Sequence, residues 1–495
     1  MWKEDGITMN KLLGKRRIMI IAAAIIVLLA AGFIYIRNAH MQLLDHTEFE
    51  AFASGIDEIT AAGGFEDQAA LRDYITGWAD DHSIEYKKDK SGNIVFNTPA
   101  VDRKKNVSPS VVCVSYNYET AADNAKLLAS AAMIAAADLK SGRKTVIFCN
   151  DVRGEGKGYR SVSKKLLSGK PKVIYMDYGA SSYLSRSSFN RVLSEITVPA
   201  ETSEVTGDAA VRIHIAGIRP GEINTSISRQ PDPVNAFSVL LSRLKAKSVV
   251  FQLSDLSVTS DGNMYPTGLD ATIIINSYSV SSFTKYIDKR IKAWERSYSA
   301  DHPDLIYSYE VIDDPDLISD SAYSEETSAT LANVLYTIQN GAYKYASGDD
   351  IPENREEGDL CGINCLYDVQ AGEDAVRIAI MTQAVNESYS DRIISDNTAA
   401  AELFGCSISI IDSIDRFNNE KDSLSRTIHK TLEKISDSGS SLKDETDNYF
   451  TPSSYLQRKN SKADIVHIRL NDRYAASFTN MILYYIATKG NFLAL

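Results

Sequence analysis

The sequence is short of histidine and cysteine. Its 495 residues include seven histidines and five cysteines, which are too few thiols for a disulfide-rich scaffold. It also lacks an extended basic tract, and its formal net charge is −12, so a nucleic-acid-binding protein is not expected. Apolar residues make up 44% of the chain and charged residues 24%, which excludes a largely disordered protein. The length predicts two to four domains of roughly 100–200 residues each.

A single apolar run is long enough to cross a membrane. Residues 18–36 contain no charge, and a helix of that length spans about 28 Å, close to a hydrocarbon core of about 30 Å. The run ends in bulky Phe33, Tyr35 and Ile36 rather than at a small-residue cleavage site, which favours an uncleaved anchor over a signal peptide. Because basic residues precede the run, we expect a single-pass cell-membrane protein with a cytoplasmic N-terminus and an extracytoplasmic bulk.

Three further apolar runs have the length of buried strands. They are residues 111–116, 145–150 and 172–177, and their lack of alternation suits parallel strands that are buried on both faces. Residues 121–139 are so rich in alanine that they predict a helix between the first two. This βαβ pattern predicts an α/β fold with a mostly parallel sheet. From about residue 200 the apolar residues alternate, which indicates an inserted α+β domain, with a helix expected at 328–345.

Carboxylates follow the ends of the predicted parallel strands, where the chemistry of such sheets gathers. Asp151 and Glu155 follow one strand, Asp177 ends another, and Asp123 opens the intervening helix. Converging carboxylates could hold one Mg²⁺, Ca²⁺ or Mn²⁺ ion. The alternative is that Asp123 caps the helix and the other carboxylates are solvated loop charges, and the residues alone favour this second interpretation.

Several segments follow one another in the order of a known family. Residues 73–99 contain a helix and a strand preceded by a D-x-x-G-N phrase, residues 122–124 read Ala-Asp-Asn, and residues 217–221 begin a segment that leads to Asn235. These segments, together with residues 415–434, resemble the aminoacyl-histidine (Xaa-His) dipeptidases, a carnosinase-like branch of the di-zinc metallopeptidases. The resemblance covers roughly residues 60–490, and it implies a catalytic domain that is split by an inserted lid.

Together the anchor and the resemblance divide the chain into six parts. These are a cytoplasmic tail (1–17), the transmembrane anchor (18–36), a linker (37–60), the first part of the metallopeptidase-like domain (61–200), the lid-like α+β domain (201–412) and the second part of the metallopeptidase-like domain (413–495).

The resemblance also implies two zinc ions, which need imidazole and carboxylate ligands and a carboxylate base. The sequence departs from this set at four places. The family's H-x-D reads Tyr116-Asn117-Tyr118, its adjacent Glu pair reads Val152-Arg153, its lid histidine falls at Glu222, and residues 447–455 contain no histidine. Asp123 and Asp177 remain as candidate metal ligands, and Asn235 remains as a candidate substrate-binding residue. His467 lies in an apolar run and is expected to be a packed core histidine, while His214 and His429 lie away from the motif positions.

We therefore expect a membrane-anchored protein that resembles a metal-dependent dipeptidase but lacks hydrolytic activity. No catalytic residue is assigned, and the retained cleft would bind a peptide or a protein partner. The alternative is an active metallodipeptidase in which Asp123, Asp151, Glu155 and Asp177 hold a single cation. A third interpretation is a structural role, with the lid used for dimerisation. Cys361 and Cys365 could form a small disulfide loop, although buried or free thiols are favoured.

Overall fold

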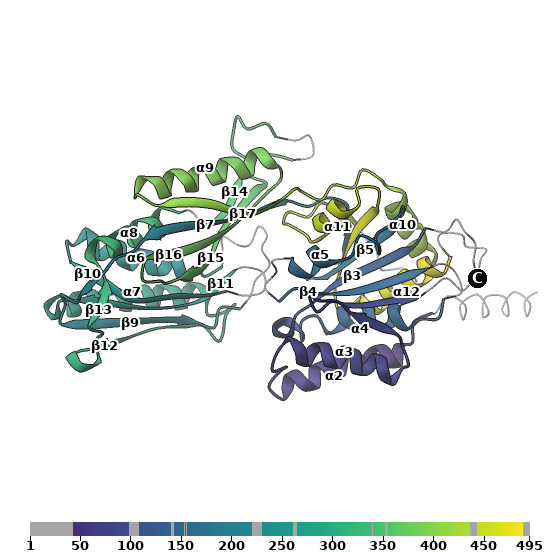
Figure 1. Ribbon diagram of the computed structural model, residues 1–495, viewed down its shortest axis with the longest axis horizontal. Coiled ribbons are helices and arrows are strands. Elements are labelled where there is room, and N and C mark those ends of the chain that lie inside the picture. Colours follow the sequence, from purple (N-terminus) through teal and green to yellow (C-terminus); the bar gives the residue numbers. More distant parts are fainter. Residues whose placement is uncertain are drawn as a thin grey trace, which may run out of the picture.

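The computed structural model describes residues 43–98, 108–139, 143–152, 154, 156–219, 230–260, 265–338, 340–351, 355–435 and 443–488. The expected anchor at residues 18–36 lies outside these ranges. Within them, no helix combines the length and the apolar character that a membrane span requires. The chain forms two lobes along its long axis (Figure 1). We call residues 190–414 the lid lobe and the remaining described residues the first lobe.

The first lobe is an α/β structure built on a mixed, mostly parallel sheet. Its strands are β1 (Tyr86–Lys88), β2 (Ile94–Thr98), β3 (Ser110–Tyr116), β4 (Lys144–Asn150), β5 (Lys172–Tyr178), β6 (Tyr183–Ser185), β18 (Lys443–Glu445) and β19 (Asp464–Leu470). They lie in the order β1-β2-β4-β3-β5-β19-β6-β18. The central strands β4, β3, β5 and β19 are parallel to one another, whereas β2 and β6 run antiparallel to their central neighbours. The α/β class and the mostly parallel sheet are thus confirmed.

Helices cover both faces of this sheet. One face carries α2 (His46–Ala61), α3 (Gln68–Asp81), α4 (Ala125–Ala136), α10 (Ser423–Ile435) and α12 (Ala475–Thr488), and the other carries α5 (Lys157–Ser161) and α11 (Ser453–Lys459). Successive residues of β3 point to opposite faces. Val112 and Val114 therefore enter the core beneath α4, whereas Val111 and Cys113 enter the core beneath α5 and α11. Burial on both faces explains why this strand is a continuous apolar run.

Helix α2 corrects one expectation, because residues 46–61 were assigned largely to a linker. Asp45 caps the helix, since its side chain accepts hydrogen bonds from the backbone of Thr47 and Glu48. Phe49, Phe52 and Ile56 are buried, and their spacing puts them on the face that packs against the first lobe. This amphipathic spacing was present in the sequence and indicates a helix.

The lid lobe consists of antiparallel sheets and the helices packed between and around them. Its strands are β7 (Asn190–Pro199), β8 (Thr202–Glu204), β9 (Ala209–Ala216), β10 (Phe251–Ser260), β11 (Pro266–Ile275), β12 (Ile306–Ile312), β13 (Ser321–Tyr323), β14 (Gly341–Lys344), β15 (Leu360–Gln370), β16 (Ala375–Ala384) and β17 (Ser407–Ile414). One sheet has the order β10-β11-β9-β12, another has the order β14-β15-β16-β7-β17, and β13 pairs with β8. The helices are α6 (Pro233–Ala246), α7 (Ser277–Tyr298), α8 (Glu325–Thr337) and α9 (Glu387–Leu403).

The expected helix at 328–345 is wrong in its second half. Helix α8 ends at Thr337, the following Ile338 is extended, and residues 341–344 form β14 beside β15. Gly341 has a φ of 125°, a conformation that a right-handed helix cannot contain and that glycine adopts readily. The two large sheets and their helices enclose one core, which positions the polar end of α6 described below.

The chain passes between the lobes in β7 and β17, which pair side by side, with Arg191 opposite Ile414. The buried guanidinium of Arg191 donates to the carbonyl oxygen of Gly154 at 2.6 Å and to the hydroxyl of Tyr455 at 2.7 Å. It also lies 4.1 Å from the ring centroid of Phe450. Arg191 therefore fastens the start of the lid to two segments of the first lobe.

Candidate functional site

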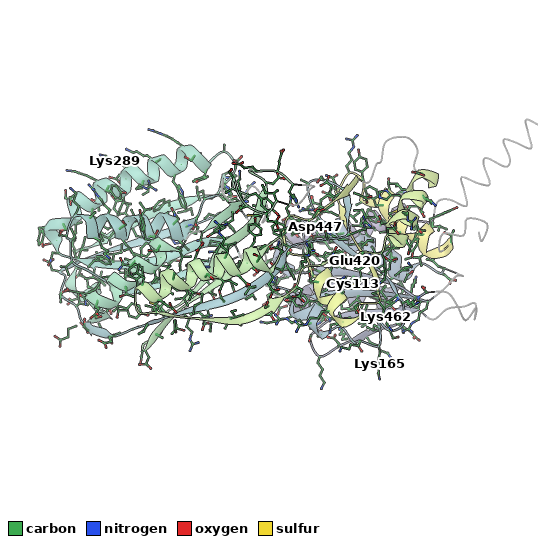
Figure 2. All side chains as sticks on the ribbon, turned by 90° about the horizontal axis from the view of Figure 1, so that it is seen from above. Cys113, Lys165, Lys289, Glu420, Asp447 and Lys462 are labelled. Carbon is green, nitrogen blue, oxygen red and sulfur yellow. The ribbon has the colours of Figure 1, made fainter. Side chains whose placement is uncertain are left out.

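Asp177, near the carboxyl end of β5, lies next to His467 in the middle of the neighbouring strand β19. The Nε2 atom of His467 lies 3.9 Å from Oδ2 of Asp177, and its Nδ1 atom lies 2.8 Å from Oδ2 of Asp447. Asp447 and His467 both have an exposed fraction of 0%. Figure 2 places Asp447 in the part of the first lobe that is nearest to the lid. The edge of the sheet thus contains a buried carboxylate–histidine pair beside a half-exposed carboxylate.

The second oxygen of Asp447 is also used. The hydroxyl of Tyr183 donates to Oδ1 of Asp447 at 2.8 Å, and it lies 3.1 Å from the hydroxyl of Tyr449. Burial raises the pKa of Tyr183, and the charge of Asp447 raises it further, against the influence of Arg469. The phenol is therefore protonated at neutral pH and is the donor in this bond.

Arg469 supplies positive charge to the same network. Its guanidinium carbon lies 5.3 Å from the ring centroid of Tyr449 and 5.9 Å from that of Tyr183, within the range of cation–π attraction. Its Nε donates to the carbonyl oxygen of Tyr178 at 3.2 Å. The imidazole of His467, the phenol of Tyr183 and the nearby guanidinium of Arg469 thus offset the cost of burying the charge of Asp447.

Tyr175 is buried beside His467 and is influenced by three carboxylates. Burial raises its pKa, and Asp177, Asp151 and Asp447 contribute further to the rise, in that order. The ring of Tyr175 lies 4.9 Å from that of His467. Asp151 is itself buried, and its Oδ1 accepts a hydrogen bond from the backbone of Gly156 at 2.8 Å. Asp151 therefore binds the loop that follows β4.

The end of β3, where the family has its first zinc-binding histidine, is occupied by residues that bind neighbouring loops. Tyr116 is buried, and its hydroxyl donates to the carbonyl oxygen of Gly92 at 2.5 Å. The side chain of Asn117 donates to the carbonyl oxygen of Val152 at 3.0 Å and accepts from the backbone of Glu119 at 3.0 Å. These side chains connect β3 to the loops before β2 and after β4.

Asp123, the first candidate metal ligand, lies exposed just before α4. Asp177, the second, lies beside His467. Within the described ranges, no group of three or more His, Cys, Asp or Glu side chains is arranged to hold a metal ion. Glu155 and Glu222 lie outside these ranges, as does Arg153. The other two named histidines have local partners, since His214 lies 2.7 Å from Asp270 and His429 lies 2.9 Å from Asp444.

The zinc ions implied by the resemblance therefore lack a fitting donor set in the described part of the chain. Nε2 of His467 has no hydrogen-bond partner there, and Asp177 offers the other nearby donor. Asp447 cannot serve as a third donor beside them, because it is hydrogen-bonded to Nδ1 on the opposite side of the imidazole. Two donors fall short of the three protein ligands that catalytic zinc normally has.

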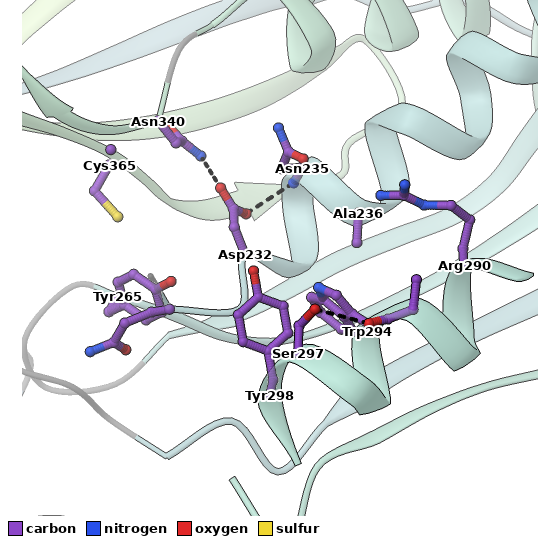
Figure 3. A pocket seen from close by; sticks show the side chains of 13 residues that line it. Asp232, Asn235, Ala236, Tyr265, Arg290, Trp294, Ser297, Tyr298, Asn340 and Cys365 are labelled. Atoms are coloured by element: carbon purple, nitrogen blue, oxygen red, sulfur yellow. Dashed lines mark hydrogen bonds between the residues drawn. The ribbon is translucent and has the colours of Figure 1, made fainter. Parts of the chain in front are cut away.

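Asn235, the candidate substrate-binding residue, lines a pocket of about 370 Å³ in the lid lobe. Figure 3 shows Asp232 in this pocket, hydrogen-bonded to Asn235 and Asn340. Asp232 caps α6 by accepting from the backbone of Asn235 at 2.9 Å, and its other oxygen accepts from the side chain of Asn340 at 3.1 Å. Burial raises the pKa of Asp232, and both bonds oppose that rise. Arg290 and Trp294 of α7 form another side of the pocket.

Sequence reasoning did not identify Asp447, Tyr183 or Arg469 as parts of a site, and it placed His467 in the core without a polar partner. Asp447 and His467 are 20 residues apart, and Tyr183 is 264 residues from Asp447. The sequence contains one indication of this network, which is a histidine inside an apolar strand. A buried histidine needs a polar partner.

The five cysteines are all buried, and none of them forms a disulfide. The small disulfide loop between Cys361 and Cys365 is therefore absent, and the free-thiol interpretation holds for both.

Comparison with known proteins finds similarity in solved structures alone. The chain matches aminoacylhistidine dipeptidase from Vibrio alginolyticus with 13% identity and a TM-score of 0.53, over 90% of this chain and 96% of that one. A tripeptidase from Staphylococcus aureus matches with 7% identity and a TM-score of 0.47, over 90% and 99% of the two chains. No family model and no curated protein matches. The chain has the fold of the dipeptidase, and an identity this low shows the fold without identifying a branch.

Proposed function

We propose that this chain is a membrane-anchored, extracytoplasmic binding protein built on a dipeptidase fold, without peptidase activity of its own. One observation carries the proposal: the buried Asp447–His467 pair, bonded to Tyr183, lies where the chemistry of this fold is expected. Residues 18–36 would anchor the chain in the cell membrane, and a peptide or protein ligand would bind outside it.

The contacts of the strand-end residues support the loss of hydrolysis. Peptide hydrolysis by a metallopeptidase needs a metal-bound water and a free carboxylate that accepts its proton. Asp447 and Asp151 both accept hydrogen bonds from the protein. Asn117, at the position of the family's H-x-D, binds Val152, at the position of the family's Glu pair. Groups that a hydrolase would present to water and metal are used here to join segments of the first lobe.

One observation favours the alternative function, an active hydrolase with a single cation. Nε2 of His467 lacks a hydrogen-bond partner in the described part of the chain, and the half-exposed Asp177 lies 3.9 Å from it. In protein metal sites, a carboxylate on one imidazole nitrogen orients the other nitrogen toward the metal. Asp447 has the required position behind His467.

A turnover assay separates the two functions. The full chain, purified in detergent, is incubated with β-alanyl-L-histidine or L-alanyl-L-histidine and added Zn²⁺, Mn²⁺ or Co²⁺. We expect no hydrolysis above the rate with metal alone. Turnover that disappears in Asp177→Ala or Asp123→Ala, while circular dichroism shows a folded chain, would establish the hydrolase. Protease protection in sealed cells tests the topology: the proposal requires that externally added protease digests the bulk.

A further inference from the structure

We infer that the lid pocket is a binding site for a free α-amino acid with an apolar side chain. The pocket lies between the N-terminal end of α6 and the C-terminal half of α7, away from the Asp447–His467 pair. The inference deepens the proposed function and rests on it in one respect, namely that the protein acts by binding. The ligand class follows from three features of the pocket wall.

The first feature is an acidic and acceptor-rich side. The carboxylate of Asp232 accepts two hydrogen bonds, and an ionised carboxylate has about four acceptor positions, so it can accept more. The Oε1 atom of Gln230, which lines the same pocket, is buried and has no hydrogen-bond partner among the described residues. A buried acceptor without a donor is costly. A ligand ammonium group offers three donors and a positive charge, which satisfies both side chains.

The second feature is a separate positive charge. Arg290 lines the pocket, and Figure 3 shows it on a different side from Asp232. No ion pair joins Arg290 to an acidic side chain in the described ranges. A guanidinium presents paired donors that match a carboxylate. Opposite charges that face one cavity without meeting each other select a ligand that carries both.

The third feature is an aromatic wall. Trp294 and Tyr298 follow Arg290 along one side of α7 at helical spacing, and their ring centroids lie 5.7 Å apart in an edge-to-face arrangement. Tyr265 adds another ring to the lining. Its hydroxyl donates to the carbonyl oxygen of Pro231 at 3.1 Å, which fixes its orientation. These rings would contact an apolar side chain, and a volume of about 370 Å³ is at the small end of ligand pockets.

Trp294 makes the inference directly measurable. The chain has three tryptophans, Trp2, Trp78 and Trp294, and the last of them lines the pocket. The experiment titrates L-phenylalanine into the full chain in detergent and records the tryptophan fluorescence. Two analogues are titrated in parallel: phenethylamine lacks the carboxylate, and 3-phenylpropanoate lacks the amine. We expect a saturable change with L-phenylalanine that is absent in Trp294→Phe, and binding at least about tenfold weaker for each analogue.

Matched variants test whether the charges of Asp232 and Arg290 bind the ligand. Asp232→Asn removes the charge but keeps a good helix cap, and Arg290→Gln removes the charge from the other side. Arg296→Gln is the control, because Arg296 is an exposed residue of the same helix that does not line the pocket. Calorimetric titration should show at least a roughly tenfold loss of L-phenylalanine affinity in the first two variants and no change in the third.

Two results would overturn the inference. One is the absence of a saturable signal from a chain that unfolds cooperatively. The other is binding that Arg290→Gln and Asp232→Asn leave unchanged. The test also separates a failure of this inference from a failure of the proposed function. If L-alanyl-L-histidine binds equally to both variants, the protein still acts by binding, but this pocket is not the site. If the chain shows metal-dependent hydrolysis, the proposed function is wrong, but the fluorescence result for the pocket remains valid.

Discussion

Asp447 lies 2.8 Å from Nδ1 of His467, and both side chains are completely buried at the edge of the first lobe. The other ring nitrogen, Nε2, lies 3.9 Å from Oδ2 of Asp177. Three tyrosine rings surround the imidazole, at centroid distances between 4.9 and 6.5 Å. The pair is therefore a structural part of the lobe.

Replacing the imidazole tests the structural role of this pair. His467→Phe keeps an aromatic ring among the tyrosines but leaves Oδ2 of Asp447 without its imidazole partner, while Oδ1 keeps the hydroxyl of Tyr183. We expect a loss of about 3 kcal/mol in the free energy of unfolding, because one oxygen of a buried carboxylate loses its partner. Urea unfolding followed by circular dichroism measures the change.

His429→Phe is the matched control, because His429 is paired with Asp444 at the surface. Surface pairs contribute about 0–1 kcal/mol, so its midpoint should move little. Equal effects of the two substitutions would contradict the assigned role of Asp447 and His467.

Arg191→Ala should loosen the lid without unfolding either lobe. It removes the bonds to Gly154 and Tyr455 and the contact with Phe450. We expect amide exchange in residues 156–161 and 453–459 to become at least about tenfold faster, since buried charged hydrogen bonds contribute about 1.5–3 kcal/mol each. Arg212→Ala, which removes an exposed pair with Glu310, should leave both segments unchanged. Unaltered exchange in Arg191→Ala would show that other contacts hold the lobes together.

Gly179 is required by the close passage of Arg469. A Cβ atom at this position would overlap the guanidinium of Arg469, which also donates to the carbonyl oxygen of Tyr178. Gly179→Ala should displace Arg469 from Tyr183 and Tyr449, and we expect a loss of about 1–3 kcal/mol, typical of overpacking. Urea unfolding measures it, and Gly77→Ala in α3, where nothing lies within 4 Å and the backbone is helical, controls for substitution of a glycine as such. A loss of stability at residue 179 no larger than that at residue 77 would contradict the packing argument.

Lys144 makes stability depend on pH. Burial lowers its pKa to about 8, and its Nζ donates to the carbonyl oxygen of Ile134 at 2.8 Å and to that of Ala137. The unfolded side chain has a pKa of about 10.4. Between these values the unfolded chain binds more protons, so this residue makes stability rise with pH, by at most about 1.4 kcal/mol per unit.

The comparison with Lys144→Met isolates this dependence. Urea midpoints at about pH 8 and about pH 9.5, which lie between the two pKa values, should increase for the natural chain relative to the variant, because the other titrating groups are common to both. Midpoints that run parallel for the two proteins over this interval would contradict the low pKa of Lys144.

The sequence was sufficient to predict the central sheet, because a continuous apolar run of strand length, such as residues 111–116, is typical of a strand buried on both faces. It also placed Tyr116 and Asn117 at the end of β3, where the family that the chain resembles has metal ligands. The sequence also contains the amphipathic spacing of α2, in a stretch that was expected to be largely a linker. The β14 strand was missed because the break at Gly341 depends on its pairing with β15.

The two candidate sites differ in how much of each could be predicted from the sequence. Asn235 was found through a motif, but its place in a pocket depends on Arg290 and Trp294, which come from a separate helix, α7, later in the chain. Asp447 lies in a polar stretch without any signature. Its role exists only because the parallel pairing of β5 and β19 brings His467 to the same edge as Asp177.

We propose that protein side chains complete the strand-end region of the central sheet, so that it holds no catalytic metal. Equilibrium dialysis of the full chain against Zn²⁺, followed by elemental analysis, is the decisive test of this proposal. We expect no stoichiometric zinc, and equal residual zinc in the natural chain and in Asp177→Ala and His467→Phe. One or two zinc ions per chain that are lost in both variants would contradict it.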